Sequence, residues 1–457
     1  MAMGKRKRQR QPQLWIAATD VPDGPGHPFY RRLNELLAGR GFDEFVEGLC
    51  AKFYHEKMGR RGIPPGVYFR MLLIGYFEGI DSERGIAWRC ADSLALRTFL
   101  GYTLTESTPD HSSLSVIRNR IDLETHQEVF AWVLAALADS KLLKGKTIGI
   151  DATTLEANAA MRSIVRRDSG ESYEQFLTGL AKASGIETPT REQLAKIDKK
   201  RKNKASNDDW QNPHDPDAKI TKMKDGRTHL SHKAEHAVDL NTEAIVAVTV
   251  QPADRGDTTS IDETVAETFE TLLDAREHGA EVELPQELVT DKGYHGNDTC
   301  TDGRELGLRT YYSEPDRGKR NWKGKPSERE AVYGNRRRIR GKRGKALMRK
   351  RAEKVERSFA HCYETGGLRR MHLRGRPNIL KRLLIHAAGF NLGLLMRKLC
   401  GLGTPRGLAE RLSGLLGDIL ALLQGLRRLL TALSRPDRPF GPNWPETAPI
   451  PAISAAA

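Results

Sequence analysis

The sequence predicts an α/β fold in which a mixed sheet flanked by helices follows an all-α N-terminal domain. Residues 29–143 carry apolar side chains at helical spacing, with short connections rich in glycine and proline. Three later runs are short, apolar and rich in β-branched residues, which is typical of strands, and a fourth run, 227–239, is longer and more polar. A helical pattern separates two of these runs, and strands that alternate with helices indicate an α/β domain. The expected strands are 146–150, 227–239, 244–250 and 287–290, and the expected helix is 259–278.

The composition is typical of a folded protein in a reducing compartment. The chain has 457 residues, of which 38% are hydrophobic, enough for two or three domains. Charged residues interrupt the leucine-rich run 408–433, and the basic start is followed by no apolar stretch, so we expect no membrane span and no signal peptide. The 5 cysteines are scattered without a C-x-x-C pair, which argues against disulfides and a zinc site. We expect a cytoplasmic, nucleoid-associated protein.

The positive charge is unevenly distributed along the chain. Lys and Arg exceed Asp and Glu by 15, and residues 317–351 hold 16 basic residues against two acids, Glu328 and Glu330. A segment this basic repels itself unless it is solvated or meets a polyanion such as a phosphate backbone. A solvated tail is the alternative, but the segment lies between two structured-looking regions. We therefore expect this segment to contact a nucleic acid.

The N-terminal part divides into a flexible basic arm, expected at residues 1–26, and a helical DNA-binding domain, expected at residues 27–143. Within this domain, Thr108 can cap a helix from whose polar side Arg118 and Arg120 would project. This pattern fits a helix-turn-helix reader of DNA. It fits an ordinary small helical bundle equally well.

The rest of the chain is expected to contain the α/β domain, at residues 144–400, and a C-terminal extension. A polar, lysine-rich insertion of low order, with room for a pair of helices, interrupts the domain at about residues 162–216. Residues 379–399 would complete its helical layer. Residues 401–433 form an amphipathic helical segment that can pack on a partner subunit or on its own chain. Residues 434–457, rich in proline and alanine, are expected to be a disordered tail.

Two aspartates stand where short apolar strands are expected to end. Asp151 follows a β-branched strand, and Asp291 follows another and precedes Gly293, which permits a sharp turn. An aspartate that merely opens a turn is the ordinary alternative for each. A desolvated acid is costly, however, unless a cation meets it. Two such strand ends side by side would set two carboxylates across a divalent ion, and Mg²⁺ or Mn²⁺ suits oxygen ligands of this kind.

A third acid can come from the helix expected at residues 346–364. The apolar residues of this helix form one stripe, and Glu356 lies about 80° from its centre. Glu353 and Glu364 lie at about 140° and 160°, so Glu356 alone borders the buried face and can reach a site underneath. A surface glutamate paired with a nearby Lys or Arg is the alternative, and spacing alone favours it.

Three short motifs each enclose one of these acids: IDATTLEANA around Asp151, VTDKGYHG around Asp291 and AEKVERSFAH around Glu356. Taken in this order, they resemble the three acidic motifs of insertion-sequence transposases of the DDE class. The likeness covers about residues 25–395, including STPDHSSLSVIRNRI in the helical region and VQPADRGD between the first two acids. The sequence departs from many relatives, which carry a Tyr, an Arg and a Lys around the glutamate; here the corresponding residues are Arg349, Ala352 and Tyr363.

The resemblance implies a ribonuclease-H-like catalytic domain and a DNA transposase that cleaves and joins the ends of an insertion sequence by phosphoryl transfer. Asp151, Asp291 and Glu356 would be its catalytic residues and the ligands of two Mg²⁺ or Mn²⁺ ions, with Asp151 bridging both. The partners would be the double-stranded DNA of the element ends and of the target, bound by a homodimer or larger oligomer, with no membrane. DNA contacts are expected from Arg118, Arg120, Lys292, Arg336, Arg337, Arg338, Arg351 and Arg357.

Two other classes of protein remain open at this point. A metal-dependent DNA nuclease would keep the three acids and cleave DNA without joining it. A non-catalytic DNA-binding protein derived from a transposase would keep the positive charge and lose the metal dependence. In that case Asp151→Asn would leave every activity intact.

Overall fold

The structure is a computed structural model that describes residues 27–55, 62–201, 205–223, 226–316, 318, 320–407 and 422–424. The chain divides into one compact unit, Met1–Pro405, and a short second one, Arg406–Ala457. The expected basic arm at residues 1–26 and the expected tail at residues 434–457 lie outside the described residues. Most of the expected helical segment at residues 401–433 lies outside them too.

Helices make up the described N-terminal part of the chain, as predicted. Side-chain oxygens cap several of them, because the first backbone N–H groups of a helix have no partner inside it. The cap of α6 is Asp110, which accepts from the Ser113 N–H at 2.9 Å, so the prediction that Thr108 caps this helix is wrong. The helices are α1 (Pro28–Gly39), α2 (Phe42–Cys50), α3 (Pro65–Glu78), α4 (Glu83–Asp92), α5 (Leu94–Leu100), α6 (His111–Arg120) and α7 (Leu123–Asp139), with a 3₁₀ turn, η2, at Ala51–Phe53.

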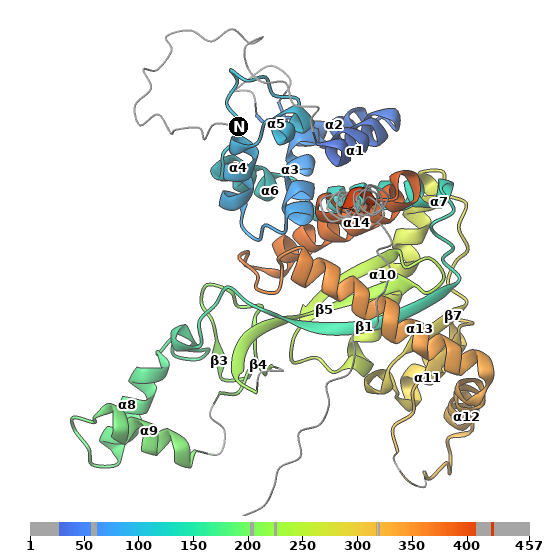
Figure 1. Cartoon of the computed structure of the whole chain (residues 1–457). Coiled ribbons are helices and arrows are strands. Elements are labelled where there is room, and N and C mark those ends of the chain that lie inside the picture. The colour runs from blue at the N-terminus through green and yellow to red at the C-terminus, as the bar shows by residue number, and fades with distance from the viewer. Residues whose placement is uncertain are drawn as a thin grey trace, which may run out of the picture. The chain divides into compact units, whose positions relative to one another are not determined.

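A mixed sheet follows, as predicted from the apolar runs (Figure 1). Its strand order is β4-β5-β1-β7-β8, and β6 pairs with β5. β5 runs antiparallel to β1, β4 and β6, whereas β7 runs parallel to β1 and β8. The sequence did not indicate β4 or β8. The bounds are β1 Thr147–Glu156, β4 Lys219–Lys222, β5 Thr228–Asp239, β6 Ile245–Pro252, β7 Glu287–Thr290 and β8 Arg309–Tyr312.

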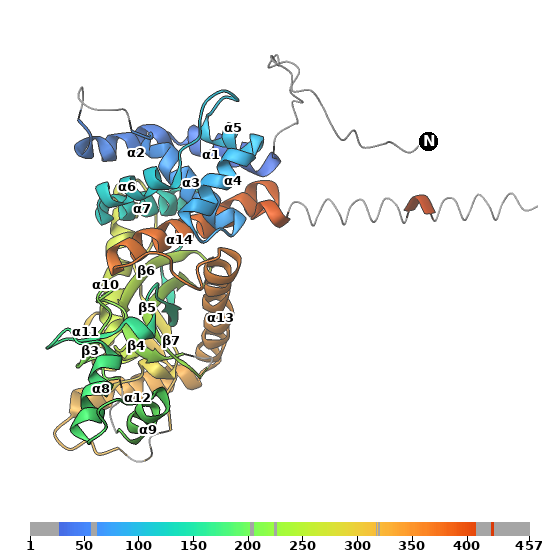
Figure 2. The same cartoon turned by 90° about the vertical axis from the view of Figure 1, so that its left-hand side faces the viewer.

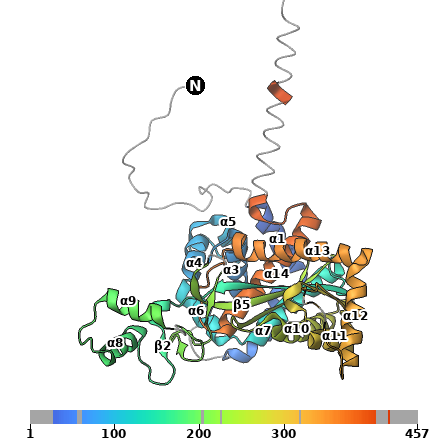
Figure 3. The same ribbon diagram turned by 90° about the horizontal axis from the view of Figure 1, so that it is seen from below.

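Two long helices cover opposite faces of the sheet, α10 (Asp257–Glu277) and α13 (Lys342–Phe359) (Figure 3). Successive side chains of a strand point to opposite faces, and β5 follows this rule. Glu235 accepts hydrogen bonds from residues of α10, whereas its neighbour His236 bonds Ser358 of α13. The face of the sheet that α13 covers is called the α13 face below. Smaller helices pack beside β8, namely α11 (Asn297–Glu305) and α12 (Pro326–Arg340).

Helix α14 (Arg376–Cys400) joins the N-terminal helices to the sheet. It packs against α3 and α7 on one side and β6 on the other (Figure 2). The Asn391 amide bonds both backbone groups of Ile245, at 3.0 and 2.8 Å, which ties the helix to β6. Among the described residues, Arg376–Gly407 is the one helix long and apolar enough to cross a membrane, but 94% of its apolar window is buried inside the protein. This helix is therefore a central element of one hydrophobic core.

The insertion between β1 and β5 was expected to have low order, with room for a pair of helices. It contains such a pair, α8 (Tyr173–Ala183) and α9 (Arg191–Lys200), and both helices are well capped. Each begins with a capping box, in which the cap side chain and a glutamine three residues later satisfy each other's backbone N–H groups. Leu177, Ala181 and Leu194 form a small core between the helices. Short elements complete the insertion: η3 at Met161–Ser163, β2 at Val165–Arg166 and β3 at Trp210–Gln211.

Candidate active site

Asp151 lies inside β1 rather than at its end, so the prediction of a strand ending at residue 150 is wrong. β1 continues to Glu156 because β5 is long enough to pair with it throughout, with Glu156 opposite Ser231. The parallel pairing with β7, in contrast, stops at Gly149 and Val289. Asp151 therefore stands where one neighbouring strand ends and the other continues.

Asp291 directly follows β7, as predicted. The register pairs Gly149 of β1 with Val289 of β7. Asp151 comes two residues after Gly149, and Asp291 comes two residues after Val289. Parallel strands in register therefore carry the two acids to neighbouring positions. The negative charge of Asp291 contributes to a raised pKa of Asp151. The Asp291 Oδ1 accepts from the Gly293 N–H at 2.8 Å, which fixes the sharp turn after the strand, η4 (Lys292–Tyr294).

An arginine holds the Asp151 carboxylate. Arg351 of α13 donates from Nη1 to Asp151 Oδ2 at 2.6 Å, and the Ala152 N–H donates to Oδ1 at 2.9 Å. The Arg351 and Asp151 side chains are 12% and 22% exposed. Burial raises the pKa of Asp151, and the Arg351 guanidinium opposes that effect. A Cβ on Gly149 would lie 3.2 Å from Arg351 Cγ, so glycine lets this side chain pass close to the strand.

A cavity of about 430 Å³ runs along β1 on the α13 face, and Glu356 lines it together with Asp151. Glu364 lines the same cavity, so the prediction that Glu356 alone can reach the site is wrong. The helix continues beyond Phe359 as a π-helical segment, η5 (Ala360–Thr365), and the change in helical pitch turns Glu364 toward the cavity. Asp291 is not among the residues that line this cavity.

Carboxylate oxygens are the ligands that Mg²⁺ and Mn²⁺ prefer, and Asp151, Asp291 and Glu356 supply them. The structure places the two aspartates on neighbouring strand positions and the glutamate on the cavity that Asp151 lines. Within the described part of the chain, however, no three His, Cys, Asp or Glu side chains already converge as a metal site. The donor set fits a divalent ion, and the Arg351 guanidinium now takes the Oδ2 atom that such an ion would need.

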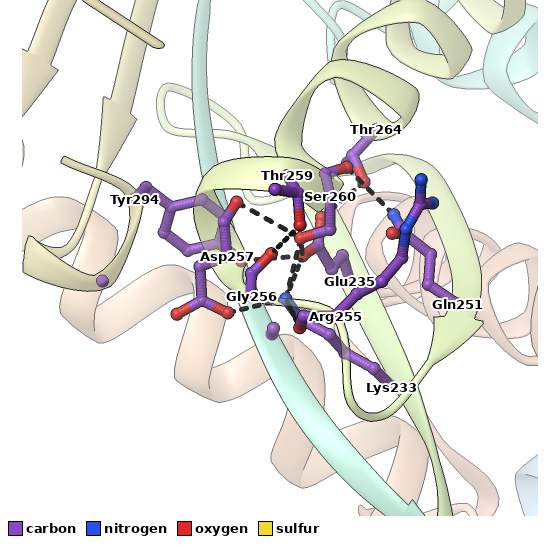
Figure 4. Close-up of polar contacts among 12 residues, drawn as sticks. Lys233, Glu235, Gln251, Arg255, Gly256, Asp257, Thr259, Ser260, Thr264 and Tyr294 are labelled. Carbon is purple, nitrogen blue, oxygen red and sulfur yellow. Dashed lines mark hydrogen bonds and ion pairs between the residues drawn. The ribbon is translucent and has the colours of Figure 1, made fainter. Parts of the chain in front are cut away.

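The opposite face of β5 carries a buried ionic network that the sequence analysis missed (Figure 4). Lys233 Nζ lies 2.6 Å from Asp257 Oδ1, 2.7 Å from Ser260 Oγ and 3.0 Å from Glu235 Oε1. The Glu235 side chain is fully buried, and it accepts further hydrogen bonds from the Ser260 and Thr264 hydroxyls of α10. Each buried charge thus has several partners, which offsets the cost of removing it from water.

This network reaches the turn that carries Asp291. The Tyr294 hydroxyl donates to Glu235 Oε1 at 3.2 Å, and burial raises the pKa of that hydroxyl, which keeps it protonated. A Cβ on Gly293 would lie 2.3 Å from Asp257 Oδ2 and 3.1 Å from Asp291 Oδ1, so both carboxylates border the same glycine. Lys233 and Glu235 are charged residues at alternate positions of β5, so they point to the same face of the sheet. This spacing could have predicted a charged pair on that face.

His236 fixes the end of α13 beside the candidate site. It lies opposite Asp151 in the β1–β5 register, with Nδ1 2.9 Å from Ser358 Oγ and Nε2 2.6 Å from Tyr363 Oη. Burial lowers the pKa of His236 to about 3, so the ring is neutral at physiological pH. The neutral ring holds the helix that bears Arg351 and Glu356 against the sheet.

The structure separates the residues expected to contact DNA into two groups. Arg120, Lys292 and Arg337 are exposed, and the Arg120 guanidinium lies over the Tyr54 ring. The other five arginines are held by partners within the chain. Glu83 of the adjacent α4 binds Arg118, so the expectation that Arg118 projects from the helix toward DNA is wrong. The partners are Glu83 for Arg118, Glu314 for Arg336, Thr310 for Arg338, Asp151 for Arg351, and Glu243 and Glu353 for Arg357.

Two family models match the chain. A transposase domain family, DUF772, matches residues 20–120, which include α1 to α6. A transposase DDE domain family matches residues 194–392, which include Asp291 and Glu356. Asp151 lies between the two matched segments, and the strand pairing places it beside Asp291. No curated protein matched the chain.

Proposed function

The chain belongs to the insertion-sequence transposases of the DDE class, and we propose that it cleaves and joins the DNA ends of its own insertion sequence by metal-dependent phosphoryl transfer. The observation that supports this most is the parallel register of β1 and β7, whose last pair, Gly149 and Val289, stands two residues before Asp151 and Asp291. Glu356 lies on the cavity that Asp151 lines. The protein acts on DNA.

Enzymes of this class generally use divalent metal ions. Asp151, Asp291 and Glu356 would hold two Mg²⁺ or Mn²⁺ ions, with Asp151 in contact with both. When bound, the ions supply an activated water or DNA 3′-hydroxyl and stabilise the leaving oxygen. The chain's own groups orient the ligands: the Ala152 N–H fixes one oxygen of Asp151, and the Gly293 N–H fixes one oxygen of Asp291.

DNA would lie along the basic surface formed by α12 and the first half of α13. Arg337 is exposed on α12, and Lys292 is exposed in the η4 turn after β7. Contacts from such residues to phosphates position DNA without reading its sequence. Arg120, at the end of α6, would contact DNA from the helical region. Two ends of one element must be brought together, so a homodimer or larger assembly in the cytoplasm is the form that would act.

A strand-transfer assay tests the function directly. The substrate is a duplex that carries one end of the DNA flanking this reading frame, together with a target plasmid. In Mg²⁺, we expect cleavage at the element end and joined product; EDTA abolishes both, and added Mg²⁺ restores them. Cleavage without joined product would favour a nuclease. Activity that persists in EDTA would contradict a metal-dependent enzyme of either kind.

Glu356→Gln is expected to lower the cleavage rate by about 100-fold, because it removes the charge of a ligand to one ion while Asp151 and Asp291 remain. Glu353→Gln is the matched control, since Glu353 is exposed on the same helix and pairs with Arg357 instead of lining the cavity. Its rate should stay within about twofold of the wild type. Equal cleavage rates of the two variants at saturating Mg²⁺ would show that Glu356 is not a catalytic residue.

A further inference from the structure

Arg351 binds the carboxylate of Asp151, the residue that would contact both ions in the proposed function. The inference therefore rests on that function. Arg351 Nη1 lies 2.6 Å from Asp151 Oδ2, while the other oxygen of Asp151 is bound by the Ala152 N–H. As a metal ligand, Asp151 would have to present its negatively charged carboxylate to the ions, and the guanidinium now holds Oδ2 of that carboxylate. The guanidinium and the ions would therefore compete for the same carboxylate.

Charge makes this competition strong. Asp151, Asp291 and Glu356 carry three negative charges, and two divalent ions would bring four positive ones. If Arg351 kept its hydrogen bond to Asp151 while the ions were bound, its guanidinium would repel the ions. Solvent would screen this repulsion poorly, since the Arg351 and Asp151 side chains are mostly buried. Without ions, the same guanidinium stabilises Asp151 in a position where burial raises its pKa. The pair thus stabilises the metal-free site and opposes the loaded one.

Arg351 has an alternative partner when DNA is bound. It lies on α13, next to the exposed Lys350 and at the end of the basic segment that would carry the phosphate backbone. Guanidinium groups bind phosphate in a bidentate manner at least as well as they bind carboxylate. The Arg351 stem passes close to the backbone of Gly149, while its guanidinium is bound at Asp151 by one hydrogen bond to Oδ2. A phosphate placed beside α13 can therefore draw the guanidinium away from Asp151.

We propose that Arg351 couples metal loading to DNA binding: it holds Asp151 while DNA is absent and transfers to a DNA phosphate when the substrate arrives, which frees Asp151 for the ions. By linkage, DNA then raises the affinity for metal and metal raises the affinity for DNA by the same factor. The arrangement keeps the protein from carrying a loaded nuclease site in the absence of its substrate. Arg351 is thus a positioning residue that acts through Asp151.

The test measures Mn²⁺ binding to the full chain without DNA, by the loss of the free-ion electron paramagnetic resonance signal. Arg351→Gln is expected to bind Mn²⁺ about tenfold more tightly than the wild type. Arg32→Gln removes the same unit of charge from an exposed ion pair, the one with Glu35 on α1, and should leave the affinity unchanged. Arg351→Met, whose side chain replaces the apolar stem of the arginine, is the second variant, and thermal unfolding shows that each variant is folded.

A second measurement adds a pre-cleaved element-end duplex with a 3′-deoxy terminus, which can be neither cut nor joined. The duplex should raise the Mn²⁺ affinity of the wild type about tenfold and that of Arg351→Gln much less. Equal Mn²⁺ affinities of the wild type, Arg351→Gln and Arg351→Met without DNA would overturn the coupling. A wild type whose Mn²⁺ affinity does not change when the duplex is added would overturn it too. Asp151→Asn separates the two hypotheses: if it binds Mn²⁺ as the wild type does, the metal site itself, and with it the proposed function, is wrong.

Discussion

Replacing Asp151 by asparagine is expected to lower the rate of DNA strand cleavage by about 1,000-fold or more, on the order of 4 kcal/mol of transition-state stabilisation. Asparagine has the same shape but no charge, and Asp151 is the acid that would contact both ions. The side chain is 22% exposed and its oxygens bind Arg351 and the Ala152 N–H. Single-turnover cleavage of an element-end duplex in Mg²⁺ measures the effect.

Asp139→Asn is the control for this loss, because Asp139 is an exposed aspartate on α7 that pairs with Arg40. Its cleavage rate should remain within about twofold of the wild type. Duplex binding without metal should survive in Asp151→Asn, since the released Arg351 can still meet a phosphate. Cleavage at the wild-type rate in folded Asp151→Asn would show that Asp151 is not a catalytic residue and that the catalytic site lies elsewhere.

Replacing Lys233 by methionine is expected to lower the free energy of unfolding by about 3–5 kcal/mol. The substitution removes the cation that meets Glu235 and Asp257, and the Glu235 side chain is fully buried. Its remaining partners are hydroxyl groups, which stabilise a buried charge less well than an ammonium group does. Urea denaturation at pH 7 measures the loss.

Two further variants distinguish an unpaired charge from lost packing. Lys233→Met combined with Glu235→Leu should recover part of the stability, because replacing a whole buried pair by apolar residues costs less than breaking it. Arg255→Met breaks an exposed pair with Glu263 and should cost less than about 1 kcal/mol. If Lys233→Met and Arg255→Met lose the same stability, the buried network does not hold the fold as described.

Local patterns were sufficient to predict most elements of the sheet and its helices. β7 has the predicted bounds, because its short apolar run lies between polar residues, and α10 begins within two residues of the expected start. The hairpin of β5 and β6 followed from two strand-like runs, the second of them rich in β-branched residues, around a turn. β1 was predicted too short, since its continuation depends on pairing with β5, a long-range contact that no local pattern encodes.

The site was predictable where it follows from strand order, and less so where it depends on tertiary partners. Asp151 and Asp291 could be placed together because parallel strands carry equivalent positions side by side. The orientation of Glu364 was wrong because a π-helical segment changes the angle per residue. The charge of an arginine does not show whether its side chain is available to DNA or is paired within the fold. Arg118 and Arg336, for example, pair with Glu83 and Glu314.

The most direct test is a crystal structure of the protein with Mn²⁺ and an element-end duplex, with the ions located by their anomalous scattering. We expect Mn²⁺ within about 2.2 Å of carboxylate oxygens of Asp151 and Asp291, with Glu356 turned into the same site and Arg351 on a phosphate. Ions bound elsewhere, or the three acids pointing into separate regions of the folded complex, would contradict the proposed metal site.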